Sequence, residues 1–185
     1  MANVDRPFGM RVDGTITGCM TGRSSQYDVT DGRDDKIAIG QIVKFDGSGY
    51  VEPASPGDEV LGVVIGVGRD NETHGETNLF DPDDLTNEGN ILDTDETGIV
   101  LVADDPQMVF EVQAADDVTD LTVGSSYEFT NNTSMNETAG RAETEISDGT
   151  TDTNLRVIAV SRTPDNDPTS EHANYRVVLT NHVYG

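Results

Sequence analysis

The sequence is poor in the residues that build large cores and covalent cross-links. It has one cysteine, Cys19, and no tryptophan, and aromatic residues make up only 5% of its 185 residues. A single cysteine excludes an internal disulfide bond, and we interpret Cys19 as a small packing residue. Hydrophobic residues amount to 34%. We therefore expect one domain with a small hydrophobic core, which takes part of its stability from neighbouring molecules.

Positive charge is scarce, and long apolar runs are missing. The chain has 11 basic and 35 acidic residues, for a formal net charge of −24. Such a charge repels phosphate backbones and anionic lipids, which argues against nucleic-acid and membrane partners. The longest apolar run, residues 60–67, is far shorter than the roughly 20 residues of a membrane span. Residues 1–6 contain no apolar stretch of a signal peptide, so we expect synthesis and assembly in the cytoplasm.

The charge is also unevenly distributed. Residues 1–44 carry equal numbers of acidic and basic groups, so the whole acidic excess lies in residues 45–185. The near-neutral first part is therefore the better candidate for an interface, and the acidic part for a solvent-facing surface. The acidity is typical of proteins that work in concentrated salt, where charges are strongly screened. An acidic, soluble particle surface explains it equally well.

Strand patterns dominate from residue 37 onward. Short runs rich in Val, Ile, Phe and Tyr alternate with turn residues, which predicts an all-β fold, a small barrel or sandwich. The predicted strands are residues 37–45, 49–53, 60–67, 99–103, 108–113, 127–130, 155–161 and 175–180. Turn residues at 46–49 and 55–58 predict an antiparallel meander over residues 37–67. Gly62 and Gly66 predict a bulge or a close backbone approach inside a strand that is buried on both faces.

The remaining segments lack periodicity. Residues 1–35 are broken by glycines and predict an extended, irregular arm in front of a body formed by residues 36–185. Two polar, acidic stretches, near residues 70–98 and 131–152, predict long loops that leave the body. They contain the Asn-x-Ser/Thr sites at Asn71, Asn131, Asn132 and Asn136, which we interpret as turn asparagines.

No constellation of residues predicts an enzyme. Asp104 and Asp105 are adjacent, and neighbouring residues of a strand point to opposite faces, so we interpret them as a turn before a proline. His74, His172 and His182 lack the close spacing of a zinc site and are interpreted as surface or loop residues. The nucleophile elbow, the phosphate-binding loop and the dinucleotide fingerprint are all missing.

One spacing suggests a metal. Asp93, Asp95 and Asp104, with Gly98 at the sixth position, approximate the order of oxygen ligands in a calcium loop. The twelfth position is an aspartate in place of the longer glutamate, and the residues after Gly98 resemble a strand. An acidic hairpin turn is the alternative, and no other cofactor is expected.

Several segments, taken in order, resemble a family of small structural proteins of tailed viruses that are associated with capsid decoration. In the second half these are LVADDP at 101–106, FEVQ at 110–113, RTPDN at 162–166 and RVVLTNHVYG at 176–185. The first half adds RPFGMR at 6–11, IGQIVK at 39–44 and GVVIG at 62–66. The resemblance covers nearly the whole chain. The acidity and the composition of residues 68–97 depart from the family.

The resemblance implies a capsid decoration, or cement, protein on the surface of a virion, assembled in the host cytoplasm. It implies a homotrimer that binds the major capsid protein through the arm. Arg6, Phe8 and Arg11 are the candidate contacts, since an aromatic ring can fill a pocket and arginines can pair with carboxylates. The arm could instead close an edge of the chain's own sheet. A strand over residues 37–45 could also extend a partner's sheet.

Two other functions remain open. A tail-tube, adaptor or fibre-base protein of a virion would use a similar small β-fold, but in far fewer copies per particle. A secreted calcium- or carbohydrate-binding β-sandwich would require export, and the lack of tryptophan for stacking on sugars counts against it.

Overall fold

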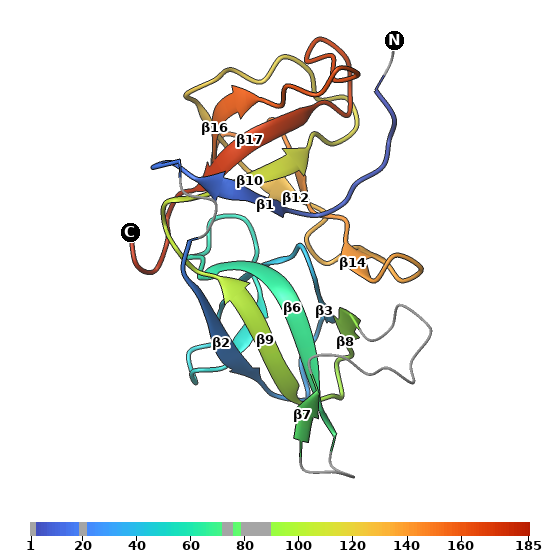
Figure 1. Cartoon of the computed structure of the whole chain (residues 1–185), viewed down its shortest axis with the longest axis vertical. Coiled ribbons are helices and arrows are strands. Elements are labelled where there is room, and N and C mark those ends of the chain that lie inside the picture. The colour runs from blue at the N-terminus through green and yellow to red at the C-terminus, as the bar shows by residue number, and fades with distance from the viewer. Residues whose placement is uncertain (1–2, 19–21, 72–75, 79–89) are drawn as a thin grey trace.

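The structure is a computed structural model that describes residues 3–18, 22–71, 76–78 and 90–185 (Figure 1). These residues form 17 β-strands and no α-helix, which confirms the all-β prediction. No helix among them is long or apolar enough to cross a bilayer. Cys19 and His74 lie outside the described residues.

Five strands form an antiparallel sheet, the β10 sheet, in the upper half of Figure 1. Its order is β1 (Arg11–Thr15), β10 (Met108–Gln113), β17 (Asn174–Leu179), β16 (Leu155–Val160) and β11 (Ser126–Tyr127). The first and last of these are edge strands. The open edge of β1 faces the lower half of the molecule (Figure 1).

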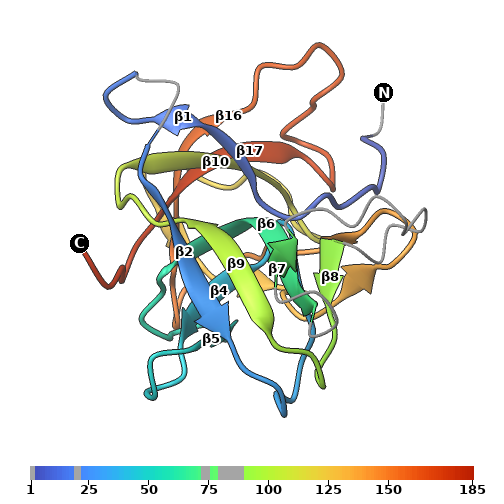
Figure 2. The same ribbon diagram turned by 60° about the horizontal axis from the view of Figure 1, so that its bottom comes forward.

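The lower half contains a second antiparallel sheet, the β9 sheet, whose strands run side by side in Figure 2. Its order is β2 (Ser24–Val29), β9 (Gly98–Ala103), β6 (Gly62–Asn71), β4 (Ile42–Phe45) and β5 (Val51–Pro53), and β7 (Glu76–Asn78) pairs with the far end of β6. The predicted hairpin at residues 46–49 joins β4 and β5. The predicted meander is wrong in one respect, because β6 pairs with β4 and leaves β5 at the edge.

Three two-stranded ribbons complete the fold. They are β3 (Ile37–Ala38) with β8 (Ile91–Leu92), β12 (Phe129–Thr130) with β15 (Glu145–Ile146), and β13 (Met135–Asn136) with β14 (Arg141–Ala142). The predicted strand over residues 37–45 is thus split into β3 and β4. Gly40 separates them, with φ of 89°, a conformation that suits glycine.

The β9 sheet is buried on both faces. Val63 and Ala103 belong to the larger core, which they share with Phe110 of β10, whereas their neighbours Val64 and Val102 belong to a second, smaller core. This assignment follows from alternation, since successive strand residues point to opposite faces. The two open sheets with a shared core form a sandwich-like fold, and neither sheet closes into a barrel.

Gly62 and Gly66 of β6 act as the sequence predicts. The register of β6 against β9 shifts between Val64 and Gly66, which leaves Ile65 as the extra residue of a β-bulge. A Cβ atom on Gly62 would lie 2.2 Å from the carbonyl oxygen of Ala103. Only glycine allows the two backbones to approach this closely.

The predicted arm over residues 1–35 is wrong for two segments. β1 pairs with β10, and all six residues of β2 pair with β9. Both are edge strands with one covered face, so their sequences contain too few apolar residues to show a strand pattern. Residues 3–10 have no regular structure, but they lie against the body, and the Met10 N–H donates to the Gly40 carbonyl oxygen at 2.8 Å.

The predicted loop over residues 131–152 is also wrong, because it contains β13, β14 and β15. Asn132, Thr144, Glu145 and Ile146 are buried there. Asn132 reaches across to Ile42 and Ala54, Thr144 donates to Asn132, and Ile146 belongs to the larger core. Of the predicted excursion 70–98, the structure describes β7, β8 and the turn before β9, while residues 72–75 and 79–89 lie outside the described residues.

Candidate functional site

Of the three predicted contact residues, Arg6 and Phe8 lie on the segment that leads into β1, and Arg11 is the first residue of β1. The backbone N–H of Arg6 donates to Gln113 Oε1 at 2.9 Å. The Arg11 guanidinium pairs with the buried carboxylate of Glu111 and lies over the Phe8 ring, 5.2 Å from its centroid. Phe8 and Arg11 therefore act together, but Arg11 already has a carboxylate partner within its own chain.

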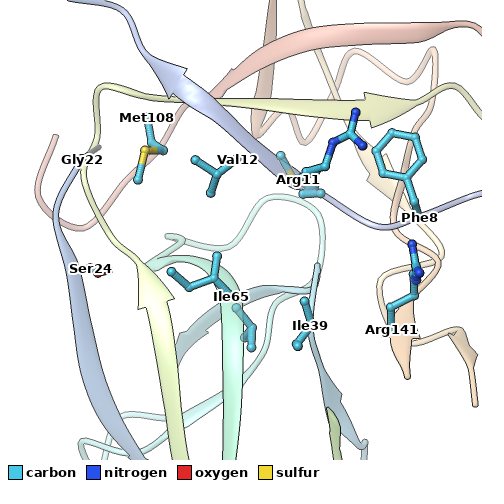
Figure 3. Close-up of a pocket in the computed structure, with 11 residues that line it drawn as sticks. Phe8, Arg11, Val12, Gly22, Ser24, Ile39, Ile65, Met108 and Arg141 are labelled. Atoms are coloured by element: carbon cyan, nitrogen blue, oxygen red, sulfur yellow. The ribbon is translucent and has the colours of Figure 1, made fainter. Parts of the chain in front are cut away.

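Phe8 and Arg11 border a groove with a volume of about 480 Å³, which we call the intersheet groove. Val12 and Met108 point into it from the β10 sheet, and Ile39 and Ile65 point into it from the opposite side (Figure 3). Its lining consists of Phe8, Met10, Arg11, Val12, Gly22, Ser24, Ile39, Val64, Ile65, Met108 and Arg141. The groove is thus mainly apolar, and it lies along the open edge of β1.

Arg141 lies at the end of the groove next to Phe8 (Figure 3). It is exposed on β14, and no ion pair joins it to another described residue. In a chain with net charge −24, a guanidinium that has no ion-pair partner among the described residues and lies beside an apolar groove is suited to bind a carboxylate.

Sequence reasoning missed Arg141, Ile65 and Met108. Arg141 comes from a segment predicted to be a loop, and Met108 follows an ordinary turn. Ile65 is part of a continuous apolar run, in which the sequence pattern does not show which residue borders a groove. Gly62 and Gly66 inside this run predicted the bulge at Ile65, but not the groove.

Asp104 is a buried carboxylate that is held by hydrogen bonds from β2 and the residue before it. It is 1% exposed. It accepts hydrogen bonds from Arg23 Nε at 3.0 Å and from the Tyr27 hydroxyl at 2.6 Å. Burial opposes its ionisation, but hydrogen bonds from Tyr27, Arg23 and Ser25 outweigh burial and lower its pKa. The Arg23 guanidinium also lies 4.4 Å from the centroid of the Tyr184 ring.

These contacts fasten β2 and the C-terminal residues to the end of β9. They leave Asp104 without access to a substrate. Asp105 forms the predicted turn, because its carboxylate accepts the N–H of Gln107 and its carbonyl oxygen accepts the N–H of Met108, both at 2.9 Å. The two adjacent aspartates thus have structural roles.

The predicted calcium loop is wrong. Asp93 and Asp95 precede β9 and Asp104 follows it, and the six residues of this strand span about 17 Å. A loop that surrounds one ion cannot contain an extended strand of this length. Cationic side chains occupy the turn at Asp93: Arg33 donates to its carbonyl oxygen, and Lys36 lies 3.3 Å from its carboxylate. The turn is acidic as predicted, but it joins strands of different sheets and is not a hairpin.

Both described histidines lie in loops, as one of the two predicted alternatives has it, His172 before β17 and His182 after it, but neither is exposed on the surface. His182 is 7% exposed, and burial lowers its pKa. The side chain of His172 is 14% exposed and lies near Asp5 and Asp116. The fold brings His172 to groups far away in the sequence, which spacing alone could not show.

Comparisons with known proteins give no family. No protein-family model matches the chain, and no curated protein matches it at a significant level. The resemblance of residues 101–113 and 176–185 to capsid decoration proteins therefore stays a prediction.

Proposed function

We propose that this protein is a capsid decoration protein of a tailed virus, and that the intersheet groove binds an extended segment of the major capsid protein. The groove carries the proposal, because it is an apolar recess at an open strand edge on a chain whose surface is otherwise strongly acidic. The resemblance of the sequence to capsid decoration proteins supports this choice of partner.

The open edge of β1 supplies the first part of the binding mechanism. An edge strand has unpaired backbone N–H and C=O groups on one side, and an extended peptide can add to it as a further strand. The side chains of such a peptide alternate between its two faces. One face then reaches Val12, Ile65 and Met108 in the groove.

Charge supplies the second part. An acidic side chain on the bound segment can reach Arg141 at the end of the groove, where the arginine has no carboxylate among the described residues. Arg11 contributes less, because it is already paired with Glu111. Phe8 forms part of the wall of the groove. In the proposed complex its ring contacts the bound segment from this position and does not insert into a pocket of the partner.

The function is tested on virus particles that carry this protein. We expect one copy per major capsid protein, or a fixed simple ratio, by quantitative mass spectrometry. We also expect density for a homotrimer at repeated positions of the capsid by cryo-electron microscopy. A few copies restricted to the portal or tail would support the adaptor alternative. Absence from the particle would refute a structural role in the virion.

The groove is tested by charge reversal of Arg141. We expect Arg141→Glu to weaken binding to purified capsids at least about 10-fold, or about 1.4 kcal/mol, because it replaces an attraction by a repulsion. Arg162→Glu is the matched control, since Arg162 is exposed and lies outside the groove. Equal binding by both variants would show that the groove is not the contact.

A further inference from the structure

Three ionisable side chains from distant parts of the sequence meet where residues 3–6 lie against the β10 sheet. Asp5, Glu145 and His172 each place one ligand atom within 4.8 Å of the others. They come from the N-terminal segment, from β15 and from the loop before β17. In Figure 1 the N-terminal segment passes beside that loop.

Amide side chains hold Asp5 in place. Gln113 accepts a hydrogen bond from the Arg6 N–H at 2.9 Å and donates one to the Val4 carbonyl oxygen at 3.1 Å. It thus fixes the backbone on both sides of Asp5. The same amide donates to the His172 carbonyl oxygen at 3.1 Å. Gln113 therefore positions two of the three side chains relative to each other.

The carboxylates of Asp5, Asp116 and Glu145 gather at this group, and no ion pair joins them to a lysine or arginine among the described residues. Glu145 is 5% exposed, and its pKa is raised by burial and by the nearby carboxylates of Asp5 and Asp116. Its hydrogen-bond donor is neutral, the side-chain amide of Asn131 at 2.6 Å. The hydrogen bond from Asn131 and the nearby imidazole of His172 act on this pKa in the opposite direction. A bound cation would offset the charge of these carboxylates.

The orientation of His172 is that of a metal ligand. Its Nδ1 atom is buried and has no hydrogen-bond partner, and it lies 3.9 Å from Asp5 Oδ1. Its other nitrogen, Nε2, lies 3.6 Å from Asp116 Oδ1. Metal-binding histidines typically face the metal with one nitrogen and a carboxylate with the other. Asp116 is thus placed to orient the ring.

We propose that Asp5, Glu145 and His172 bind a divalent transition-metal ion of the zinc class. One imidazole nitrogen and two carboxylate oxygens form a three-ligand set that such ions accept, with a fourth position for water. Calcium and magnesium prefer oxygen ligands alone and more of them. Bonds of about 2.0–2.2 Å require the ligands to move closer. Asp5 can do so, because its side chain is 63% exposed.

The ion would tie the N-terminal segment to the body of the protein. Asp5 is the only ligand of the set on that segment, whereas Glu145 and His172 belong to the body. Metal binding therefore adds a cross-link to the contacts made by Gln113. Because the ion binds the folded protein in preference to the unfolded chain, it raises the melting temperature.

The test is isothermal titration of chelator-treated protein with zinc chloride, together with thermal melting. We expect one equivalent to bind and the melting temperature to rise. Glu145→Gln keeps an oxygen for Asn131, and His172→Asn keeps a residue that tolerates the positive φ of 59° at this position. Both variants should lose the zinc-induced rise. Asp116→Asn should weaken binding about 10- to 100-fold.

Asp95→Asn is the matched control, because it removes one exposed carboxylate elsewhere on the acidic surface. It should bind zinc as the unchanged protein does. Cobalt gives a second measurement, since its visible absorption bands report the coordination geometry of the bound ion and should be lost in His172→Asn. Unchanged zinc binding by both ligand variants would overturn the proposal. Weak binding of many equivalents, equal for zinc and magnesium, would overturn it as well.

Discussion

Asn132 offers the sharpest test of how the two halves of the molecule are held together. Its side chain is 5% exposed. Its Nδ2 atom donates to the carbonyl oxygens of Ile42 and Ala54, both at 2.8 Å. Its Oδ1 atom accepts the Ile42 N–H at 2.8 Å and the Thr144 hydroxyl at 2.9 Å. One amide thus uses all four of its hydrogen bonds to join β4, the segment after β5, and the segment before β15.

The change Asn132→Ala removes all four bonds at once. The Ile42 carbonyl oxygen keeps the Ala54 N–H as a donor, so three groups lose the partner that the amide supplied: the Ile42 N–H, the Ala54 carbonyl oxygen and the Thr144 hydroxyl. Each buried polar group without a partner costs about 1–3 kcal/mol. Because water can reach part of the space, we expect a total loss of about 4 kcal/mol in the free energy of unfolding. For a chain of this size the melting temperature should fall by about 8–16 °C.

Urea unfolding measures this loss, provided that the m-value stays unchanged. Asn136→Ala is the matched control, because Asn136 lies in the same segment and in the same Asn-x-Thr/Ser context. Its side chain is exposed and accepts one hydrogen bond, from the Ala139 N–H, so we expect less than about 1 kcal/mol. A loss of less than about 1 kcal/mol for Asn132→Ala would refute this account of the junction.

Two further changes test the backbone and the buried imidazole. Gly62→Ala should cost on the order of 3 kcal/mol, because the new methyl group would lie 2.2 Å from the Ala103 carbonyl oxygen. Gly66→Ala should change little, since its nearest neighbour would be Leu101 Cβ at 3.5 Å; equal losses in denaturant melts would contradict this. Burial lowers the pKa of His182 below its ordinary 6.5, so the unfolded chain takes up the proton first as the pH falls. The stability that depends on neutral His182 should be complete above pH 6.5 and decline below it, and an unchanged pH profile in His182→Asn would disprove this contribution.

Most strands could be predicted from the sequence, because their signal is local. The apolar run at residues 108–113 became β10 with its bounds unchanged. The turn at residues 46–49 fixed the β4–β5 hairpin through Asp46, whose carboxylate accepts the N–H groups of Ser48 and Tyr50. In both cases the residues that decide the structure are neighbours in sequence, so their pattern is visible without the fold.

The parts that could not be predicted depend on distant partners. β2 has the sequence SSQYDV, and its stability comes from pairing with the apolar strand β9. The polar composition of residues 131–152 predicted a loop, but Asn132 and Glu145 of this segment are buried. A buried polar residue has the same letter as an exposed one, and only its hydrogen-bond partners distinguish the two.

The candidate site shows the same limit. Phe8 and Arg11 were found from their residue types, and both border the groove. Arg11 already pairs with Glu111 of the same chain, which the sequence did not show, and its contact with a capsid carboxylate stays a prediction. Asp5 lies more than a hundred positions before Glu145 and His172 in the sequence. No spacing rule for metal sites could therefore have grouped the three residues.

The docked N-terminal segment changes how a decoration protein of this kind would bind. An arm that becomes ordered only on the capsid loses conformational entropy at that moment, which reduces its affinity. Here Gln113 and the pairing of β1 with β10 have ordered the segment already, so the proposed groove is preorganised. Apolar contacts and added strand hydrogen bonds depend little on ionic strength, whereas the net charge of −24 repels any acidic partner. Salt screens this repulsion and leaves the apolar contacts and the strand hydrogen bonds intact. Binding of the capsid segment through the groove should therefore strengthen as the salt concentration increases, whereas binding dominated by ion pairs would weaken.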